Sequence, residues 1–261
     1  MKLIYLTCLL LLPFGFALGQ AAPIHYHSDF EHQAFDELDP FKILFSSDPN
    51  VDLSKYNSYR ADFNHLVAKL KSYQQRHTKL QTIEKAFFYT HKKKLLRYNK
   101  YVTLGELFEN GKYDCLTGTA LYALLLKHLN ISYSIYEFDF HVLILSGING
   151  DTVLIESTDP RYGFETKDKY IKERLSRFDA QTQANKKTSS STSIQYGKLI
   201  ANQVSLTELA GLQYYNLAIK AYNVADYNLA QQMLNKADFL YPSRRMQSIS
   251  AILQKTIASN D

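Results

Sequence analysis

The feature that most constrains this chain is a helix-length run that is apolar on nearly every side. Residues 116–129 read LTGTALYALLLKHL, and they leave no continuous polar face of the kind that a surface helix keeps. Other parts of the chain must therefore cover this helix all round. Asp114 stands before the run and can cap it, because its side chain can accept hydrogen bonds from the first free backbone N–H groups.

Three strand-like runs follow this helix. The first, ISYSIYEF from Ile131, alternates apolar and polar residues, whereas HVLILSG and DTVLIES are short and continuously apolar, as central strands are. Residues 147–151 (GINGD), between the last two runs, are typical of a hairpin turn. The sequence therefore predicts an α+β fold in which a buried helix packs on a small antiparallel sheet.

Helical patterns precede this unit. Residues 36–99 include YRADFNHLVAKLKSY, which places apolar side chains at helical spacing. The run Lys92-Lys93-Lys94 is interpreted as a solvated helix face rather than a nucleic-acid or lipid site. The net charge of +5 suggests an acidic partner only weakly, and no RNA- or DNA-binding motif accompanies it, so we expect no nucleic-acid partner.

The C-terminal part is predicted to be a separate helical tail. Residues 179–193 are polar and low in complexity, which indicates a linker or loop over 178–204. Residues 205–261 are helical in pattern, and the spacing typical of one tetratricopeptide repeat is matched at Tyr214, Leu217, Ala218, Ala221, Ala230, Leu234, Ala237 and Pro242. Since one repeat cannot bury its own apolar face, this helical hairpin should dock on the preceding domain or on a protein partner.

The N-terminus is typical of a secretory signal peptide. Lys2 supplies a positive start, residues 3–18 are almost wholly apolar, and Ala17-Leu18-Gly19 fits a cleavage site. We therefore assign 1–19 to a signal peptide and 20–177 to the first domain. The expected location is the periplasm or the exterior of the cell, with no membrane span after cleavage.

Cleavage would leave Cys115 as the only cysteine, because the other one is Cys8. An unpaired thiol is a liability in an oxidising compartment, so its presence there favours a use. Cys115 also opens the buried helix, where the helix dipole and free N–H groups favour the thiolate. The sequence favours a nucleophile, although a small buried core residue is the open alternative.

Two further residues fit the same chemistry. His141 begins the second strand-like run and Asp159 follows the third, so neighbouring strands would bring both to one sheet edge. Cys115 at the helix start could face that edge. In this arrangement Cys115 attacks an acyl carbon, His141 takes up and returns the proton, and Asp159 orients the imidazole.

Together these residues resemble the transglutaminase-like superfamily, over about residues 104–159. The resemblance rests on Gly111 and Cys115 before an apolar helix, His141 at a strand start, and the segment LIESTDP that ends in Asp159 and Pro160. It implies a papain-like fold with Cys115 as nucleophile, His141 as base and Asp159 as orienting acid. Active members transfer an acyl group through a thioester, and some bacterial members carry a tetratricopeptide-like tail.

The resemblance and the residues together predict an exported cysteine-dependent acyl-transfer enzyme that hydrolyses an amide bond of a peptide, protein or peptidoglycan. The oxyanion of the reaction needs hydrogen-bond donors. The Cys115 backbone N–H would be one, and Asn110 or Tyr113 the other. No cofactor is expected.

A catalytically inactive binding module of the same fold is the alternative. It would hold a protein or peptide partner in its groove and along its C-terminal helices. Two departures from the superfamily pattern favour it: Tyr113 stands where many members have glycine, and the chain has no tryptophan. His25, His27 and His32 near the N-terminus are not expected to form a metal site, so no metal is predicted.

Overall fold

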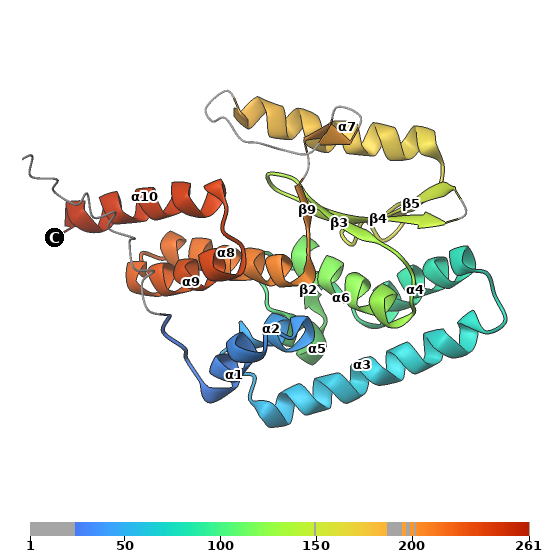
Figure 1. Cartoon of the computed structure of the whole chain (residues 1–261), viewed down its shortest axis with the longest axis horizontal. Coiled ribbons are helices and arrows are strands. Elements are labelled where there is room, and N and C mark those ends of the chain that lie inside the picture. The colour runs from blue at the N-terminus through green and yellow to red at the C-terminus, as the bar shows by residue number, and fades with distance from the viewer. Residues whose placement is uncertain (1–23, 149, 187–194, 197–198, 201, 261) are drawn as a thin grey trace, which may run out of the picture.

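The computed structural model describes residues 24–148, 150–186, 195–196, 199–200 and 202–260. The predicted signal peptide at 1–19 lies outside them. Within the described ranges, the fold combines ten helices with a five-stranded antiparallel sheet (Figure 1), which confirms the α+β class. No helix in this part of the chain is long and apolar enough to cross a membrane.

The first four helices of the described chain each begin where a capping side chain accepts a backbone N–H. They are α1 (Asp29–Glu37), α2 (Pro40–Ser46), α3 (Leu53–Gln74) and α4 (Lys79–Lys93). The short parallel strands β1 (Arg97–Tyr98) and β2 (Lys112–Tyr113) flank α5 (Leu104–Asn110). Gly111 ends α5 in the left-handed region at φ 72°, which lets the chain turn directly into β2.

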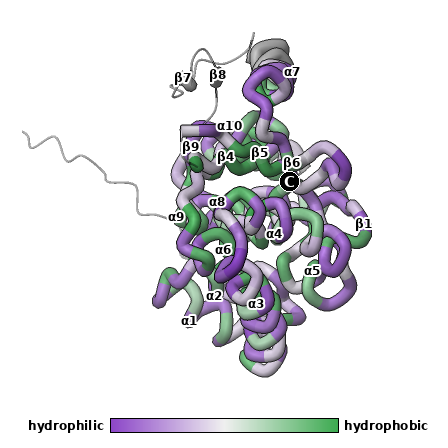
Figure 2. Tube along the Cα trace, turned by 90° about the vertical axis from the view of Figure 1, so that its right-hand side faces the viewer, coloured by the Kyte–Doolittle hydropathy of each residue, from purple (hydrophilic) through white to green (hydrophobic). Residues whose placement is uncertain are grey.

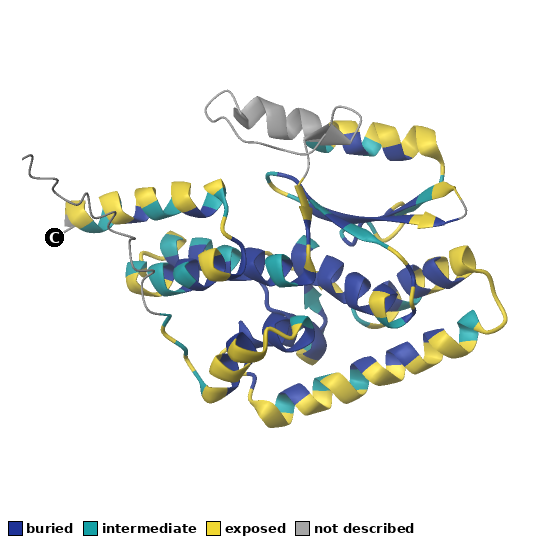
Figure 3. Cartoon of the chain, viewed as in Figure 1, coloured by how far each residue is buried: buried dark blue, intermediate teal, exposed yellow. Residues whose placement is uncertain are grey.

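Helix α6 (Cys115–His128) lies at the centre of the molecule. Every residue from Leu116 to Leu126 is buried, and Figure 3 shows α6 mostly in the colour of buried residues. Asp114 caps the helix by accepting from the backbone N–H groups of Leu116 and Thr117. The predicted buried helix and its cap are both confirmed.

The three predicted strands form the middle of the sheet, whose order is β6-β5-β4-β3-β9. They are β3 (Ser134–Glu137), β4 (Val142–Ile148) and β5 (Asp151–Ile155), with β6 (Phe164–Glu165) and β9 (Asn202–Val204) at the edges. The β4 side chains alternate between two cores: Val142 and Ile144 join the core around α6, while Leu143 and Leu145 pack under α7 (Asp168–Lys186). Burial on both faces explains why this strand is continuously apolar, and Figure 2 shows β4 and β5 as hydrophobic.

The range 178–204, predicted as a linker, differs from that expectation at both ends. Helix α7 continues to Lys186, and two short paired strands, β7 (Gln195–Tyr196) and β8 (Leu199–Ile200), follow. Strand β9 then joins the edge of the sheet, with Val204 opposite Ile135 of β3. A three-residue strand such as β9 depends on its distant partner and not on a pattern of its own. The polar composition of this range therefore predicted only a loop.

The C-terminal helices pack on the N-terminal part of the chain. They are α8 (Leu206–Asn223), α9 (Tyr227–Leu240) and α10 (Arg244–Asn260), and α8 contacts α2 and α6. A buried polar cluster joins the two parts: Lys236 Nζ of α9 donates to both carboxylate oxygens of Glu31 in α1, each at 2.8 Å. Tyr214 Oη of α8 donates to the same carboxylate at 2.7 Å.

Breaking this ion pair should be costly, because Lys236 and Glu31 are both fully buried. Lys236→Met leaves a buried carboxylate without its cation and should lower the free energy of unfolding by about 3–5 kcal/mol. The double variant Glu31→Gln/Lys236→Met should regain most of the loss, because no unpaired charge remains. Urea denaturation measures both values, and a Lys236→Met cost below about 1 kcal/mol would contradict the account.

In contrast to this paired cluster, the buried side chain of His91 has no hydrogen-bond partner among the described residues. His91 of α4 lies against the Phe87 ring at a centroid distance of 4.6 Å, and neither of its ring nitrogens has a partner among the described residues. Burial lowers the pKa of His91 to about 4, and the charges of Asp159 and Glu156 oppose the shift only in part. His91 is therefore neutral in the folded protein at neutral pH.

This histidine should make the protein acid-sensitive. Between its unfolded pKa of about 6.5 and its folded pKa of about 4, only the unfolded state binds the proton, so stability falls as the pH drops through this window. The free energy of unfolding should be about 2–3 kcal/mol lower at pH 4.5 than at pH 7 from this residue alone. Urea titrations of His91→Leu should show that part of the pH dependence removed, and an unchanged dependence would refute the assignment.

Candidate active site

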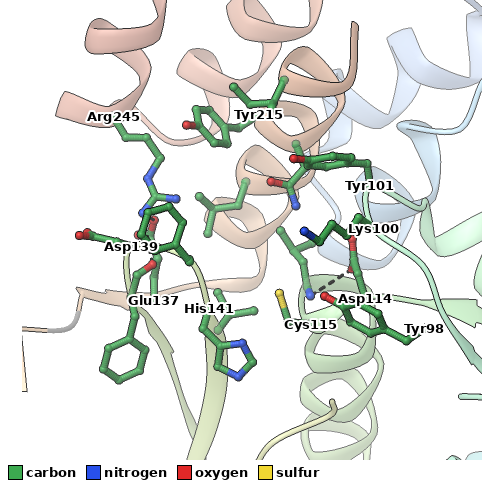
Figure 4. Close-up of a pocket in the computed structure, with 17 residues that line it drawn as sticks. Tyr98, Lys100, Tyr101, Asp114, Cys115, Glu137, Asp139, His141, Tyr215 and Arg245 are labelled. Atoms are coloured by element: carbon green, nitrogen blue, oxygen red, sulfur yellow. Dashed lines mark hydrogen bonds and ion pairs between the residues drawn. The ribbon is translucent and has the colours of Figure 1, made fainter. Parts of the chain in front are cut away.

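A cavity of about 310 Å³ opens where the N-terminus of α6 meets the β3–β4 turn and helix α8 (Figure 4). Its walls come from five parts of the chain that are distant in sequence. The lining residues are Tyr98, Lys100, Tyr101, Asp114, Cys115, Leu116, Glu137, Phe138, Asp139, Phe140, His141, Val142, Leu212, Tyr215, Asn216, Ile219 and Arg245. Two of the predicted catalytic residues, Cys115 and His141, are among them.

The first turn of α6 is fixed against the ends of β4 and β5. Ser157 Oγ, just beyond β5, donates to the Cys115 carbonyl oxygen at 3.2 Å. Thr119 Oγ1 donates to the Val142 carbonyl oxygen at 3.3 Å. Gly118 allows this approach, because a Cβ atom there would lie 2.6 Å from Ser157 Cβ. The thiol is thus held beside the strand start that carries His141.

The Cys115 thiol is protonated at neutral pH in this environment. Burial raises its pKa to about 12 and the Asp114 carboxylate adds to the shift, while the backbone N–H groups of Val142, Cys115 and Leu116 oppose it without overcoming it. Asp114 also accepts the N–H groups at the helix start, so this carboxylate, rather than the thiol, receives their stabilisation. The thiolate expected from the helix dipole is therefore not what the structure favours, and a nucleophilic Cys115 would need a base.

His141 is held from three sides. Its carbonyl oxygen accepts from the Phe138 N–H at 2.7 Å and closes the β3–β4 turn. Its ring stacks on Phe178 of α7 at a centroid distance of 4.5 Å and an angle of 15°. Its buried Nε2 lies 3.3 Å from Glu156 Oε1, which is within ion-pair range although the angle does not suit a linear hydrogen bond.

The other ring nitrogen, Nδ1, is left for the cavity. Unlike Nε2, Nδ1 is not fully buried. It makes no hydrogen bond within the described residues. In Figure 4 one ring nitrogen of His141 lies on the side of the Cys115 sulfur and the other lies away from it. No hydrogen bond joins the sulfur to the ring in the described structure, so the proton has no preformed bond from thiol to imidazole.

The carboxylate beside His141 belongs to Glu156 and not to Asp159, the residue predicted for that role. Asp159 Oδ1 accepts from the N–H groups of Arg161 and Tyr162, which holds the turn after β5. Its Oδ2 lies 3.1 Å from Arg174 Nη2, and Arg174 Nη1 lies 2.9 Å from Glu156 Oε2. Among the residues that the structure describes, no ion pair or hydrogen bond joins Asp159 to His141.

The strand register explains this placement. Ile144 of β4 lies opposite Ile155 of β5, so Glu156 follows β5 on the α7 side of the sheet, in step with Leu154. His141 precedes β4 in step with Leu143, on that same side. The period of two along each strand was the signal in the sequence that pointed to Glu156, and the resemblance to the family pattern favoured Asp159 instead.

Glu156 is a carboxylate that stays ionised at neutral pH. Burial alone would raise its pKa, but the nearby His141 ring, the hydrogen bond from Thr158 and the charge of Arg174 outweigh it, so the pKa lies below the ordinary value. An ionised carboxylate beside Nε2 favours the tautomer with its proton on Nε2. That tautomer leaves Nδ1 as a proton acceptor facing the cavity.

Neither predicted oxyanion donor lies in the cavity wall. Asn110 Oδ1 accepts from the Lys112 N–H at the end of α5, and Tyr113 is buried with its ring near His91. The backbone N–H groups of Val142, Cys115 and Leu116 are the donors that act on the thiol and oppose the rise of its pKa.

The C-terminal helices complete the cavity, which sequence reasoning did not foresee. Arg245 Nη2 of α10 lies 3.0 Å from Glu137 Oε1, and its guanidinium lies over the Tyr215 ring at 5.5 Å. Tyr241 Oη donates to the other oxygen of Glu137 at 2.7 Å. These contacts link the tail to the β3–β4 turn, and no local sequence pattern signals them.

Comparison with known proteins gives no match. No protein-family model, no curated protein and no solved structure matches the chain.

The protonated thiol leads to a prediction for alkylation. Iodoacetamide should label Cys115 of the folded protein at least ~100-fold more slowly at pH 8 than a model thiol with a pKa of about 8.5, because little thiolate is present. Asp114→Asn keeps a capping side chain but removes the charge, and should speed labelling. Intact-mass spectrometry follows the reaction, with urea-unfolded protein as the control. Labelling at the rate of the model thiol would contradict the raised pKa.

Proposed function

We propose that this protein is a cysteine-dependent acyl-transfer enzyme that hydrolyses a peptide or amide bond through a thioester on Cys115. The observation that carries the proposal is the arrangement around one cavity. The Cys115 thiol and the accessible Nδ1 of His141 share its wall, while Glu156 lies 3.3 Å from Nε2 on the far side of the ring. A nucleophile, a base and an orienting acid in this order are what acyl transfer requires.

In the proposed reaction His141 acts as a general base at the moment of attack. Nδ1 takes the proton from Sγ as the sulfur bonds to the carbonyl carbon, and Glu156 stabilises the imidazolium that forms. The imidazolium then protonates the leaving nitrogen as the C–N bond breaks, which leaves a thioester. Water, deprotonated by Nδ1, attacks the thioester; the C–S bond breaks, the acid leaves and the thiol recovers its proton.

Arg174 has a positioning role in this scheme. It bridges Glu156 and Asp159 at 2.9 and 3.1 Å, so it keeps Glu156 ionised and fixed beside the imidazole. Asp159 then supports Arg174 rather than His141.

The likeness to the transglutaminase-like superfamily, with its papain-like fold, is part of this proposal. A thiol at a helix start, in the same cavity wall as a histidine that directly precedes a strand, supports it, with Glu156 in the place that the likeness gave to Asp159. The α8–α9 hairpin, joined at Ala225-Asp226, supports the tetratricopeptide type for the tail. Under this proposal the protein is exported and acts on a peptide, protein or peptidoglycan amide.

A binding module without catalysis is the second candidate, and the state of the thiol favours it. A thiol with a pKa of about 12 is a poor nucleophile unless His141 removes its proton. The cavity walls from α8 and α10, with Tyr215 and Arg245, would hold a peptide equally well without any reaction.

Acylation by p-nitrophenyl acetate separates the two candidates. The enzyme should release a burst of about one equivalent of p-nitrophenolate and carry one acetyl group on Cys115, seen by intact mass. His141→Ala should slow the burst by about 10²–10⁴-fold and Glu156→Gln by about 10–100-fold. Asp159→Asn should have a much smaller effect, because Asp159 does not touch the ring.

His65→Ala is the matched control, because His65 is exposed on α3 and does not line the cavity. Its burst should equal that of the wild type. If the wild type is not acylated, or if His141→Ala reacts at the same rate, the protein is the binding module and the proposed enzyme is wrong.

A further inference from the structure

A second cavity, of about 320 Å³, lies between the C-terminal half of α3 and helix α4, and the proposed reaction makes no use of it. Its lining is almost entirely basic and aromatic. The residues are Lys69, Leu70, Ser72, Tyr73, Arg76, His77, Lys85 and Tyr89. Three of them are permanent cations, and no carboxylate is found among the described residues that line it.

The charge around this cavity is not compensated by the neighbouring sequence. Residues 69–94 contain eight lysines and arginines but a single acidic residue, Glu84, which does not line the cavity. Lys94 is neutralised by an ion pair with Asp62, whereas Lys69, Arg76 and Lys85 have no acidic partner in the part of the chain that the structure describes. The cavity therefore carries a net positive charge that a ligand could neutralise.

Aromatic rings hold two of the ammonium groups near one another. Lys69 Nζ donates to Tyr89 Oη at 3.0 Å and lies 4.4 Å from the centre of that ring. Lys85 Nζ lies 5.6 Å from the Tyr73 ring and 5.9 Å from the Tyr89 ring. The pKa of Tyr89 is lowered, first by the hydrogen bond from Lys69 and then by the nearby lysine charges, which agrees with a positive potential in the cavity.

The remaining wall is also fixed. The His77 ring stacks on the Tyr73 ring at a centroid distance of 3.6 Å, and its Nδ1 lies 2.8 Å from the Tyr73 carbonyl oxygen. Arg76, which also lines the cavity, lies next to His77 just beyond the end of α3.

We propose that this cavity binds a phosphate-bearing ligand. Three cations around one small cavity match an oxyanion with two or more negative charges better than a single carboxylate, and arginine and lysine are the side chains that recognise phosphate. The same chemistry is offered by a soluble phosphate ester and by the headgroup of an anionic phospholipid. The site lies on α3 and α4, apart from the cavity that holds Cys115, so it does not rest on the proposed enzyme.

The test compares two double variants with equal charge change. Lys69→Gln/Lys85→Gln removes two cations that line the cavity, whereas Lys71→Gln/Lys92→Gln removes two exposed lysines of the same helices that do not. Inorganic pyrophosphate is titrated calorimetrically at about 50 mM salt, where screening is weak. A second arm measures co-sedimentation with vesicles of phosphatidylcholine, with and without phosphatidylglycerol.

Saturable pyrophosphate binding that Lys69→Gln/Lys85→Gln weakens about 10-fold or more, and Lys71→Gln/Lys92→Gln by less than about 2-fold, supports the site. Binding only to vesicles that contain phosphatidylglycerol, with the same difference between variants, supports it with a lipid headgroup as the ligand. Equal losses in both double variants show diffuse surface charge and overturn the proposal. The proposal is also overturned if the protein binds neither pyrophosphate nor the vesicles that contain phosphatidylglycerol.

Discussion

Enclosure of α6 is the constraint on which the rest of the structure depends. A helix that is apolar on every side has to be covered on every side, and the sheet, α4 and α8 together do this. Its polar start, at Asp114 and Cys115, reaches the cavity that His141 also lines. The thiol therefore lies in the cavity wall at the N-terminal end of this buried helix.

Two carboxylates with opposite consequences flank this position. Asp114 caps α6 and, after burial, contributes to the raised pKa of the thiol, so helix stability is gained at the expense of thiolate formation. Glu156 lies on the other side of His141 and is kept ionised by its hydrogen bonds and by Arg174. The proposed chemistry therefore depends on a base that acts during the attack, rather than on a standing thiolate–imidazolium pair.

Local patterns in the sequence were sufficient for α6, its cap, the strands β3 to β5 and the candidate pair Cys115 and His141. What they could not supply was the partner of each distant residue. Strand β9 is polar and is defined by its pairing with β3, and Arg245 reaches Glu137 only because the start of α10 lies beside the end of β3. The alternation of side chains along β5 could have indicated Glu156. Asp159, a residue of the following turn, resembled the family pattern more closely and was chosen instead.

The central claim is that Glu156 holds His141 with a basic nitrogen toward Cys115. Long-range ¹H–¹⁵N correlation spectra of histidine-labelled protein at pH 8 test it most directly, because they report which ring nitrogen carries the proton. The account predicts that His141 is protonated on Nε2 and unprotonated on Nδ1, and that Glu156→Gln weakens this preference. A proton on Nδ1, with Nε2 bare beside Glu156, would contradict it.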